Sequence, residues 1–210
     1  MNTVVIIDYG MGNVKSVQRG VECVGATAVL SSDPDVIANA DRVVLPGVGA
    51  FEEGMKGLKE SGLDDAIHWF CRKGNPLLGI CLGMQMLLDQ SKENGKHKGL
   101  GLISGTVEPI PRYSDDLFVR KTPLIGWCVL RSPVHQKDWG GTCLRNTKVD
   151  EYFYFVHSFM AIPENNEDLL AQCMYGDFPV TAAVRRDNVT GLQFHPEKSG
   201  ESGLIILREF

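Results

Sequence analysis

Short apolar runs alternate with segments that carry apolar residues at helical spacing over the first eighty residues. Apolar runs of this length are typical of strands buried on both faces, and their alternation with helices predicts a parallel sheet covered by helices. The expected strands are residues 3–8, 26–30, 42–47 and 76–80, and the expected helices are 14–24, one that starts at Pro34 after the capping residue Asp33, and one or two within 51–73.

The pattern changes after about Ser91, where a polar loop with glycines covers residues 91–99. Strand-like segments follow, separated by Pro, Gly, Asn and Asp residues, and we expect them to pair mostly antiparallel. These segments are residues 105–110, 124–130, 151–159, 169–175 and 181–194, and a helix with an apolar face is expected over 199–210. Because no repeat or long linker divides the chain, residues 1–210 are expected to form one domain.

Composition and charge narrow the classes of function. The 210 residues are 43% hydrophobic, which suffices for a sizeable core. The net charge of -5 is spread over both signs, and no Lys/Arg cluster is long enough to follow a phosphate backbone, so nucleic acid is not an expected partner. The N-terminus lacks the features of a signal peptide, and no run approaches the ~18 apolar residues of a membrane span. A cytoplasmic protein without membrane contact is expected.

The cysteines give no support to a metal or redox motif from their spacing. None forms a C-x-x-C pair, and in a reducing cytosol most free cysteines are small buried hydrophobes. The cysteines are Cys23, Cys71, Cys81, Cys128, Cys143 and Cys173.

Cys81 lies between two glycines, in the sequence GICLG, where an expected strand becomes a helix. This is a G-x-C-x-G form of the nucleophile elbow, in which Gly79 and Gly83 lack the β-carbons that would collide across a tight turn. The start of a helix favours a thiolate over a thiol. Alternatively, the glycines only end a strand and Cys81 is an ordinary core thiol. The motif alone does not decide between the two interpretations.

A cysteine nucleophile needs a base that a third group holds in place. The segment LQFHPEKS contains His195 and Glu197, which point to one face if the backbone is extended, so that Glu197 orients the imidazole toward Cys81. Pro196 would keep this segment from becoming helical. The ordinary alternative is a solvated strand end, which the presence of a cysteine elbow in the same chain makes less convincing.

Acyl transfer also needs donors for an oxyanion. The segment LPGVGAF (45–51) follows an expected strand, and its glycines allow backbone N–H groups to approach a substrate. The carboxyl ends of parallel strands meet at one edge of a sheet, so this loop and Cys81 are expected to lie close together. A simple connecting turn is the alternative.

PGVGAF, GICLGMQ, YFVHS and LQFHPEKS occur in this order over nearly the whole chain, with DYGMGN near the N-terminus. Together they resemble the class I (triad) glutamine amidotransferases, and among these the glutaminase subunits of imidazole glycerol phosphate synthases. The resemblance implies a class I glutamine amidotransferase-like (flavodoxin-like) α/β fold, with a central, mostly parallel sheet flanked by helices and additional antiparallel strands. It makes Cys81 the nucleophile, His195 the base and Glu197 the residue that orients the base.

The resemblance also implies further site residues. Gly47, Val48, Gly49 and Leu82 would supply the oxyanion site, and Gln85, His157 and Ser158 would contact bound glutamine, the last two through the backbone. Asn13, Tyr154 and Lys198 would lie near a partner subunit, although Tyr154 is equally well a core aromatic and Lys198 a solvated charge. The family implies no metal and no organic cofactor.

In the reaction that the resemblance implies, the Cys81 thiolate attacks the side-chain amide of L-glutamine, and His195 protonates the departing ammonia. Water then hydrolyses the γ-glutamyl thioester to glutamate. In the family, the ammonia passes through a (β/α)-barrel cyclase subunit of a heterodimer, which closes the imidazole ring in histidine biosynthesis and activates the glutaminase.

One segment departs from the family pattern. Where the family typically reads P-H-M-G-W-N, this chain reads PLIGWC, with Leu124 and Cys128 in place of two polar residues. A changed partner surface leaves a second interpretation open: a paralogous glutaminase that supplies ammonia to a different barrel synthase, such as one that amidates a sugar.

Two other classes of protein are alternatives. A non-catalytic regulatory or scaffold protein would need a damaged triad, and all three triad residues are present. A cysteine peptidase or esterase would not explain why H-P-E occurs together with YFVHS.

Overall fold

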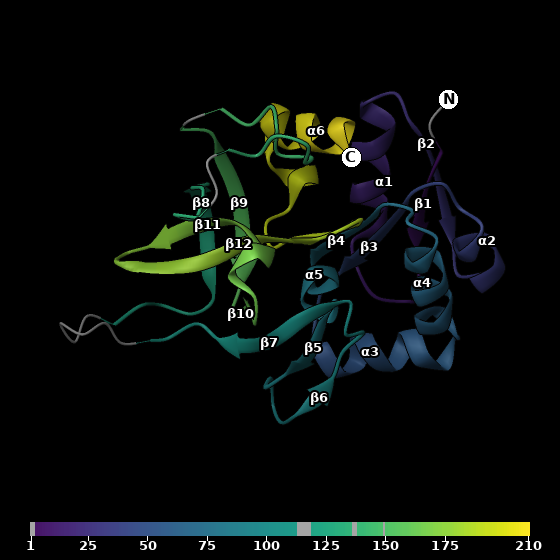
Figure 1. Ribbon diagram of the computed structural model, residues 1–210, viewed down its shortest axis with the longest axis horizontal. Coiled ribbons are helices and arrows are strands. Elements are labelled where there is room, and N and C mark those ends of the chain that lie inside the picture. Colours follow the sequence, from purple (N-terminus) through teal and green to yellow (C-terminus); the bar gives the residue numbers. More distant parts are fainter. Residues whose placement is uncertain (1–2, 113–118, 136–137, 149) are drawn as a thin grey trace.

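A computed structural model describes residues 3–112, 119–135, 138–148 and 150–210 of the chain (Figure 1). Its described part is built on a seven-stranded sheet with the order β11-β12-β13-β4-β3-β1-β2. The strands from β13 to β2 are parallel, and β12 and β11 extend that sheet in antiparallel pairing. Their bounds are β1 Thr3–Ile7, β2 Thr27–Ser31, β3 Val43–Gly47, β4 Leu77–Cys81, β11 Leu169–Tyr175, β12 Phe178–Arg186 and β13 Val189–Leu192.

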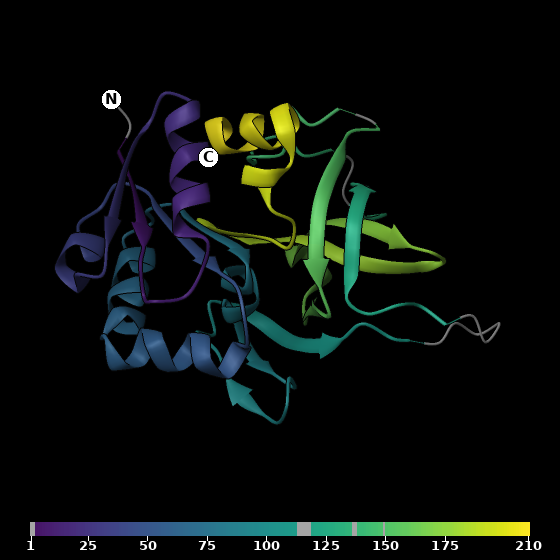
Figure 2. The same cartoon turned by 180° about the vertical axis from the view of Figure 1, so that it is seen from behind.

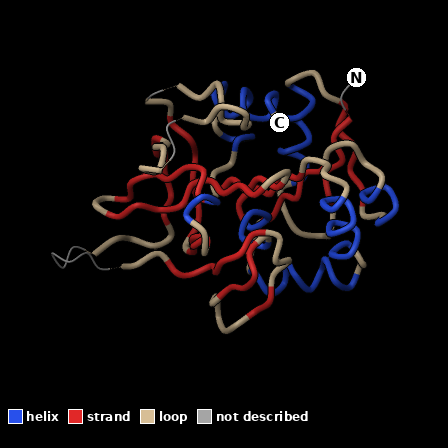
Figure 3. The backbone as a smooth tube through the Cα atoms, viewed as in Figure 1, coloured by secondary structure: helices blue, strands red, loops and turns tan. Residues whose placement is uncertain are grey.

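Helices cover both faces of this sheet, as Figures 2 and 3 show. Helices α1 (Val14–Cys23) and α6 (Gly200–Glu209) pack together on one face, and α3 (Phe51–Glu60), α4 (Leu63–Arg72) and the short α5 (Leu82–Met86) lie on the other. Helix α2 (Pro34–Ala38) packs beside α4, and its N-terminus is capped by the Asp33 side chain, as predicted.

Two hydrophobic cores lie on the two faces of the sheet. Successive residues of β1 alternate between them: Val5 and Ile7 belong to the core under α3 and α4, and Val4 and Ile6 belong to the core under α1 and α6. This alternation follows from the period of two residues in a strand. The predicted parallel sheet with helices on its faces is thus confirmed.

Two smaller sheets complete the described structure. One has the order β10-β7-β5-β6, and the other is the antiparallel pair β8-β9. Their bounds are β5 Leu88–Ser91, β6 His97–Lys98, β7 Ile103–Pro109, β8 Leu124–Val129, β9 Tyr152–His157 and β10 Phe159–Pro163, and two 3-10 turns are η1 Asn166–Asp168 and η2 Pro196–Lys198. No helix in the described ranges is long and apolar enough to cross a membrane.

The structure corrects one expectation about the second half of the chain and confirms another. Residues 181–194 do not form one strand but belong to a hairpin of β12 and β13, which turns at Asp187 with a φ of 52°. The expected, mostly antiparallel pairing is confirmed by the pairs β10-β7, β11-β12, β12-β13, β5-β6 and β8-β9. Two pairs are parallel, β13 with β4 and β7 with β5. The parallel pairing of β13 brings the residues that follow it to the same sheet edge as Cys81.

The fold predicts unequal costs for two glycine-to-alanine substitutions. A Cβ at Gly83 would lie 1.9 Å from the Leu45 carbonyl oxygen, which is fixed in β3, whereas a Cβ at Gly54 would meet the flexible Met86 side chain, with Sδ at 2.8 Å. We expect Gly83→Ala to lower the free energy of unfolding by at least about 2 kcal/mol. Gly54→Ala should cost less than about 1 kcal/mol, because a thioether repacks and Ala favours a helix.

Urea unfolding followed by circular dichroism measures both free energies. Equal losses in the two variants would contradict the rigid approach of α5 to β3.

Candidate functional site

Cys81 adopts a strained backbone conformation between β4 and α5. Its φ is 55° and its ψ is -110°, a combination that residues other than glycine rarely adopt. A Cβ at Gly79 would lie 2.8 Å from the Gly83 carbonyl oxygen, so both glycines are needed for the chain to turn this closely. The predicted elbow geometry is therefore present. Because α5 contains only five residues, the peptide dipoles behind Cys81 are few.

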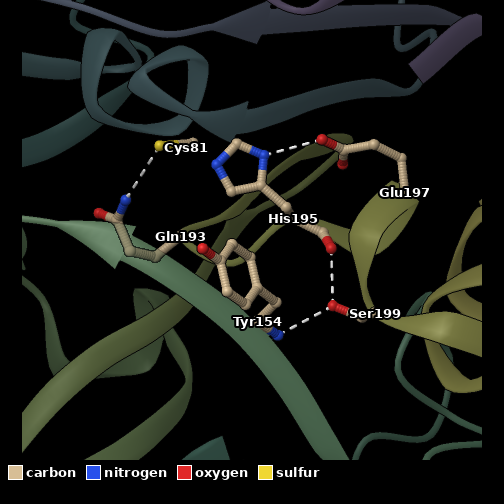
Figure 4. Close-up of polar contacts among 6 residues, drawn as sticks. All are labelled: Cys81, Tyr154, Gln193, His195, Glu197 and Ser199. Carbon is tan, nitrogen blue, oxygen red and sulfur yellow. Dashed lines mark hydrogen bonds and ion pairs between the residues drawn. The ribbon is translucent and has the colours of Figure 1, made fainter. Parts of the chain in front are cut away.

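His195 and Glu197 form a buried pair next to Cys81. The distance between His195 Nδ1 and Glu197 Oε1 is 2.8 Å, and the two side chains are 3% and 1% exposed. The other edge of the imidazole points toward Cys81 (Figure 4). The structure thus brings together the three residues predicted as a triad.

The backbone that joins His195 to Glu197 differs from the expected extended form. His195 itself is extended, but Pro196 begins the 3-10 turn η2, which carries Glu197. The expectation that Pro196 prevents a helical turn is wrong, because proline fits the first position of a helix, where no N–H donor is needed. The carboxylate reaches the imidazole from this turn and not along a strand.

Backbone bonds hold His195 against β9. Its N–H donates to the Tyr154 carbonyl oxygen at 2.9 Å. The Ser199 hydroxyl donates to the His195 carbonyl oxygen at 2.6 Å and accepts from the Tyr154 N–H at 3.0 Å (Figure 4). Both the N–H and the carbonyl oxygen of His195 are therefore held by hydrogen bonds.

Burial and neighbouring charges shift the pKa of His195 in opposite directions. Burial disfavours its protonated form, but hydrogen bonding to Cys81 and Glu197 and their negative charges outweigh burial and raise the pKa of His195 from 6.5 to about 9. At neutral pH the imidazole is therefore protonated.

A cavity of about 380 Å³ opens beside Cys81 and His195. Such a volume is in the range of small-molecule sites. Its lining contains the predicted residues Val48, Gly49, Leu82, Gln85, His157 and Ser158, together with Cys81, His195, Glu93, Val156 and Phe159. Gly47 lies just outside this cavity and lines a small neighbouring void with Asn13 and Glu197.

The three residues predicted near a partner lie at or close to the surface around this site. Asn13 and Lys198 are exposed, and Tyr154 is half-buried. The Tyr154 ring packs edge-on against Trp127, with centroids 5.7 Å apart, so it is not a core aromatic. Their contact with a partner stays a prediction.

The two residues that depart from the family pattern lie on β8 and contribute little to its outer surface. Leu124 is buried and pairs with His157 across the β8-β9 ladder, and Cys128 is half-buried and packs against the core under α1 and α6. The exposed side chains of this ribbon are instead Ile125, Trp127 and Tyr152.

Sequence reasoning missed two polar residues of the site. The Gln193 amide donates to Cys81 Sγ at 3.7 Å, and Glu93 lines the cavity while its carboxylate accepts from the Phe51 N–H at 2.7 Å. Gln193 precedes His195 by two residues, a spacing that places both on one side of an extended chain. Glu93 lies in a polar loop, and no pattern in the sequence singles it out.

His157 should make stability depend on pH. Burial lowers its pKa from 6.5 to about 4, although its bond to the Phe159 carbonyl oxygen opposes this shift. The unfolded chain gains this proton below pH 6.5, but the folded chain gains it only near pH 4, so stability falls as pH decreases through that window. The loss from this group is up to about 3 kcal/mol.

We expect His157→Gln to flatten the dependence of the free energy of unfolding on pH between 6.5 and about 4. Urea unfolding across that window measures it, with His68→Gln on α4 as the control for loss of one imidazole. An unchanged slope in His157→Gln would contradict the buried, neutral state of His157.

Comparisons with known proteins agree with this geometry. The family model "Glutamine amidotransferase class-I" matches residues 5–210. The imidazole glycerol phosphate synthase subunit HisH 1 of Legionella pneumophila (strain Lens) is 49% identical over 210 residues, covering 100% of this chain and 99% of the relative. The corresponding HisH of Geobacillus thermodenitrificans is 43% identical, covering 100% and 95%.

A solved structure shares the fold. The structure of PurLQS from Thermotoga maritima aligns with a TM-score of 0.75 at 18% identity, over 99% of this chain and 96% of that one. Together, the family match and the full-length relatives show that the chain belongs to the class I glutamine amidotransferases, in the family of the HisH subunits of imidazole glycerol phosphate synthase.

Proposed function

We propose that this chain is the glutaminase subunit of an imidazole glycerol phosphate synthase in histidine biosynthesis, hydrolysing L-glutamine to glutamate and ammonia. The observation that carries the proposal is the line of Cys81, His195 and Glu197, of which Cys81 and His195 line one cavity and Glu197 lies behind the imidazole. The names of relatives at 40–49% identity favour this pathway over a different barrel synthase.

The proposed reaction assigns each charge change to a group of the site. The Cys81 thiolate attacks the δ-carbon of the substrate amide, and the new oxyanion is bound by backbone N–H groups of Leu82 and of the loop 47–49. Protonated His195 gives its proton to the leaving nitrogen, and ammonia departs. Neutral His195 then takes a proton from water, which attacks the thioester and releases glutamate and the thiolate. Glu197 holds Nδ1 of the imidazole throughout.

Side-chain and backbone groups of the cavity suit the polar groups of glutamine. The Gln85 amide nitrogen donates to the Phe159 carbonyl oxygen at 3.1 Å and to Gln193 Oε1 at 3.0 Å, which leaves its own oxygen for a substrate N–H. The Glu93 carboxylate provides the negative charge that an α-ammonium group requires. We propose that Ser158 and His157 contact the substrate carboxylate through their backbone.

The proposed partner is a (β/α)-barrel cyclase that receives the ammonia. The exposed apolar side chains of the β8-β9 ribbon, Ile125, Trp127 and Tyr152, support a protein contact beside the cavity. Tyr154 packs against Trp127 of this ribbon, and Asn13 lines the void beside His195 and Glu197. These two residues and the exposed Lys198 are proposed to touch the barrel. The single domain 1–210 and the cytoplasmic location stay predictions from the sequence.

We expect Cys81→Ala to abolish glutamine hydrolysis, because no other group would form the thioester. Coupled glutamate detection measures the rate, and Cys23→Ala, which alters an exposed cysteine of α1, should keep it. Glutaminase activity retained in purified Cys81→Ala would overturn the proposal.

A second expectation concerns the partner. Glutaminase turnover should rise when a barrel cyclase and its acceptor ligand are added, since the glycines of the loop 47–49 permit more than one backbone conformation. Free ammonium should support the cyclase without this chain. Equal glutamine turnover with and without the cyclase would argue against activation by a partner.

A further inference from the structure

We propose that Gln193 is a catalytic residue, whose side-chain amide donates a hydrogen bond to Cys81 Sγ and stabilises the thiolate in both halves of the reaction. The inference rests on the proposed function for its link to glutamine, but the contact itself is a property of the folded chain. Gln193 is fully buried, and its Nε2 lies 3.7 Å from Sγ.

Gln193 and His195 approach the sulfur from different directions. Both follow β13, which pairs in parallel with β4, the strand that ends in Cys81. The Gln193 N–H donates to the Ala182 carbonyl oxygen at 2.9 Å, which fixes the backbone of that residue against β12. In Figure 4 the Gln193 amide lies on one side of the sulfur and the His195 imidazole on the other.

A second hydrogen bond determines which end of the amide faces the sulfur. Gln85 Nε2 donates to Gln193 Oε1 at 3.0 Å and to the Phe159 carbonyl oxygen at 3.1 Å. Because Gln193 Oε1 is the acceptor for Gln85, Gln193 Nε2 is turned toward Cys81 as a donor. The reversed amide would put an oxygen beside a thiolate and two N–H groups against each other.

The physical effect of such a donor is large in a buried site. An amide taken out of water is costly unless it is paired, and a hydrogen bond to an ionised group is stronger than one between neutral groups. The pair Gln193–Cys81 therefore favours the ionised sulfur, whereas an apolar neighbour at this position would favour the neutral thiol.

Gln193 supplies a hydrogen bond to the sulfur that does not depend on the protonation state of His195. After His195 has given its proton to ammonia, it is neutral and acts as the base for water. When the tetrahedral intermediate collapses, the C–S bond breaks and its electron pair returns to sulfur. The Gln193 amide retains its hydrogens through both steps, so it can stabilise the leaving thiolate at that point.

The test is the rate at which iodoacetamide alkylates Cys81 as a function of pH, with the Cys81 peptide quantified by mass spectrometry. Quantifying this peptide separates the alkylation of Cys81 from that of the exposed Cys23. In Gln193→Met we expect the midpoint of the alkylation profile to move upward by about one pH unit, because a bond to the charged form is lost. We also expect kcat for glutamine to fall on the order of tenfold or more, with a much smaller change in KM.

Two further variants make the result decisive. Gln193→Glu keeps the size of the side chain and the acceptor for Gln85 but places a carboxylate beside the sulfur, so the midpoint should move upward further. Gln172→Met, on β11 of the same sheet, is the matched control and should keep the wild-type midpoint and kcat.

The proposal is overturned if folded Gln193→Glu has the wild-type alkylation midpoint, or if Gln193→Met lowers kcat without moving the midpoint. Either outcome would make Gln193 a packing residue. Alkylation needs no glutamine, so its result does not depend on the proposed glutaminase function. A failure of that proposal would be seen separately, as glutamine turnover that persists in Cys81→Ala.

Discussion

The close approach of the first turn of α5 to β3 and β4 is the constraint on which the rest of the site depends. It requires glycine at positions 79 and 83, and it holds Cys81 at a positive φ. Such strain persists only where the surrounding packing over-determines the backbone, and here the packing is the interior of the central sheet. Because β3, β4 and β13 are parallel neighbours, the loop 47–49, Cys81 and His195 all emerge at one sheet edge.

Two buried histidines near that edge have opposite protonation behaviour. Burial lowers the pKa of both, but His195 also faces Cys81 and Glu197, whereas the nearest acceptor of His157 is a neutral backbone carbonyl. One histidine is therefore positioned to give a proton at neutral pH, and the other stays neutral in the cavity wall. The difference comes from the charged partners and not from the depth of burial.

Much of the fold and part of the site can be predicted from the sequence. Apolar runs with helical spacing between them predict the parallel sheet, and G-x-C-x-G with H-P-E predicts the residues that meet at its edge. These signals are local in sequence, or combine two local motifs. The elbow in particular needs the absence of two β-carbons, which the sequence shows, and the H-P-E motif decides between an elbow and a core thiol.

The features that could not be predicted depend on contacts between distant segments. The turn at Asp187 splits an apparently continuous strand, and β13 pairs in parallel with the side of β4 that lies opposite β3. The contact of Gln193 with Cys81 joins residues 112 positions apart, and Glu93 reaches the cavity from a loop without a pattern of its own. Likewise, Pro196 is compatible with an extended strand or the start of a 3-10 turn, and packing decides between them.

The central claim is that the strained backbone presents Cys81 as the acyl-accepting nucleophile. Mass spectrometry of the Cys81 peptide after acid quenching during turnover with L-glutamine tests this most directly. The account predicts a γ-glutamyl group on the Cys81 sulfur that disappears when substrate is exhausted. Turnover without any acyl group on Cys81, or with the acyl group on another residue, would contradict it.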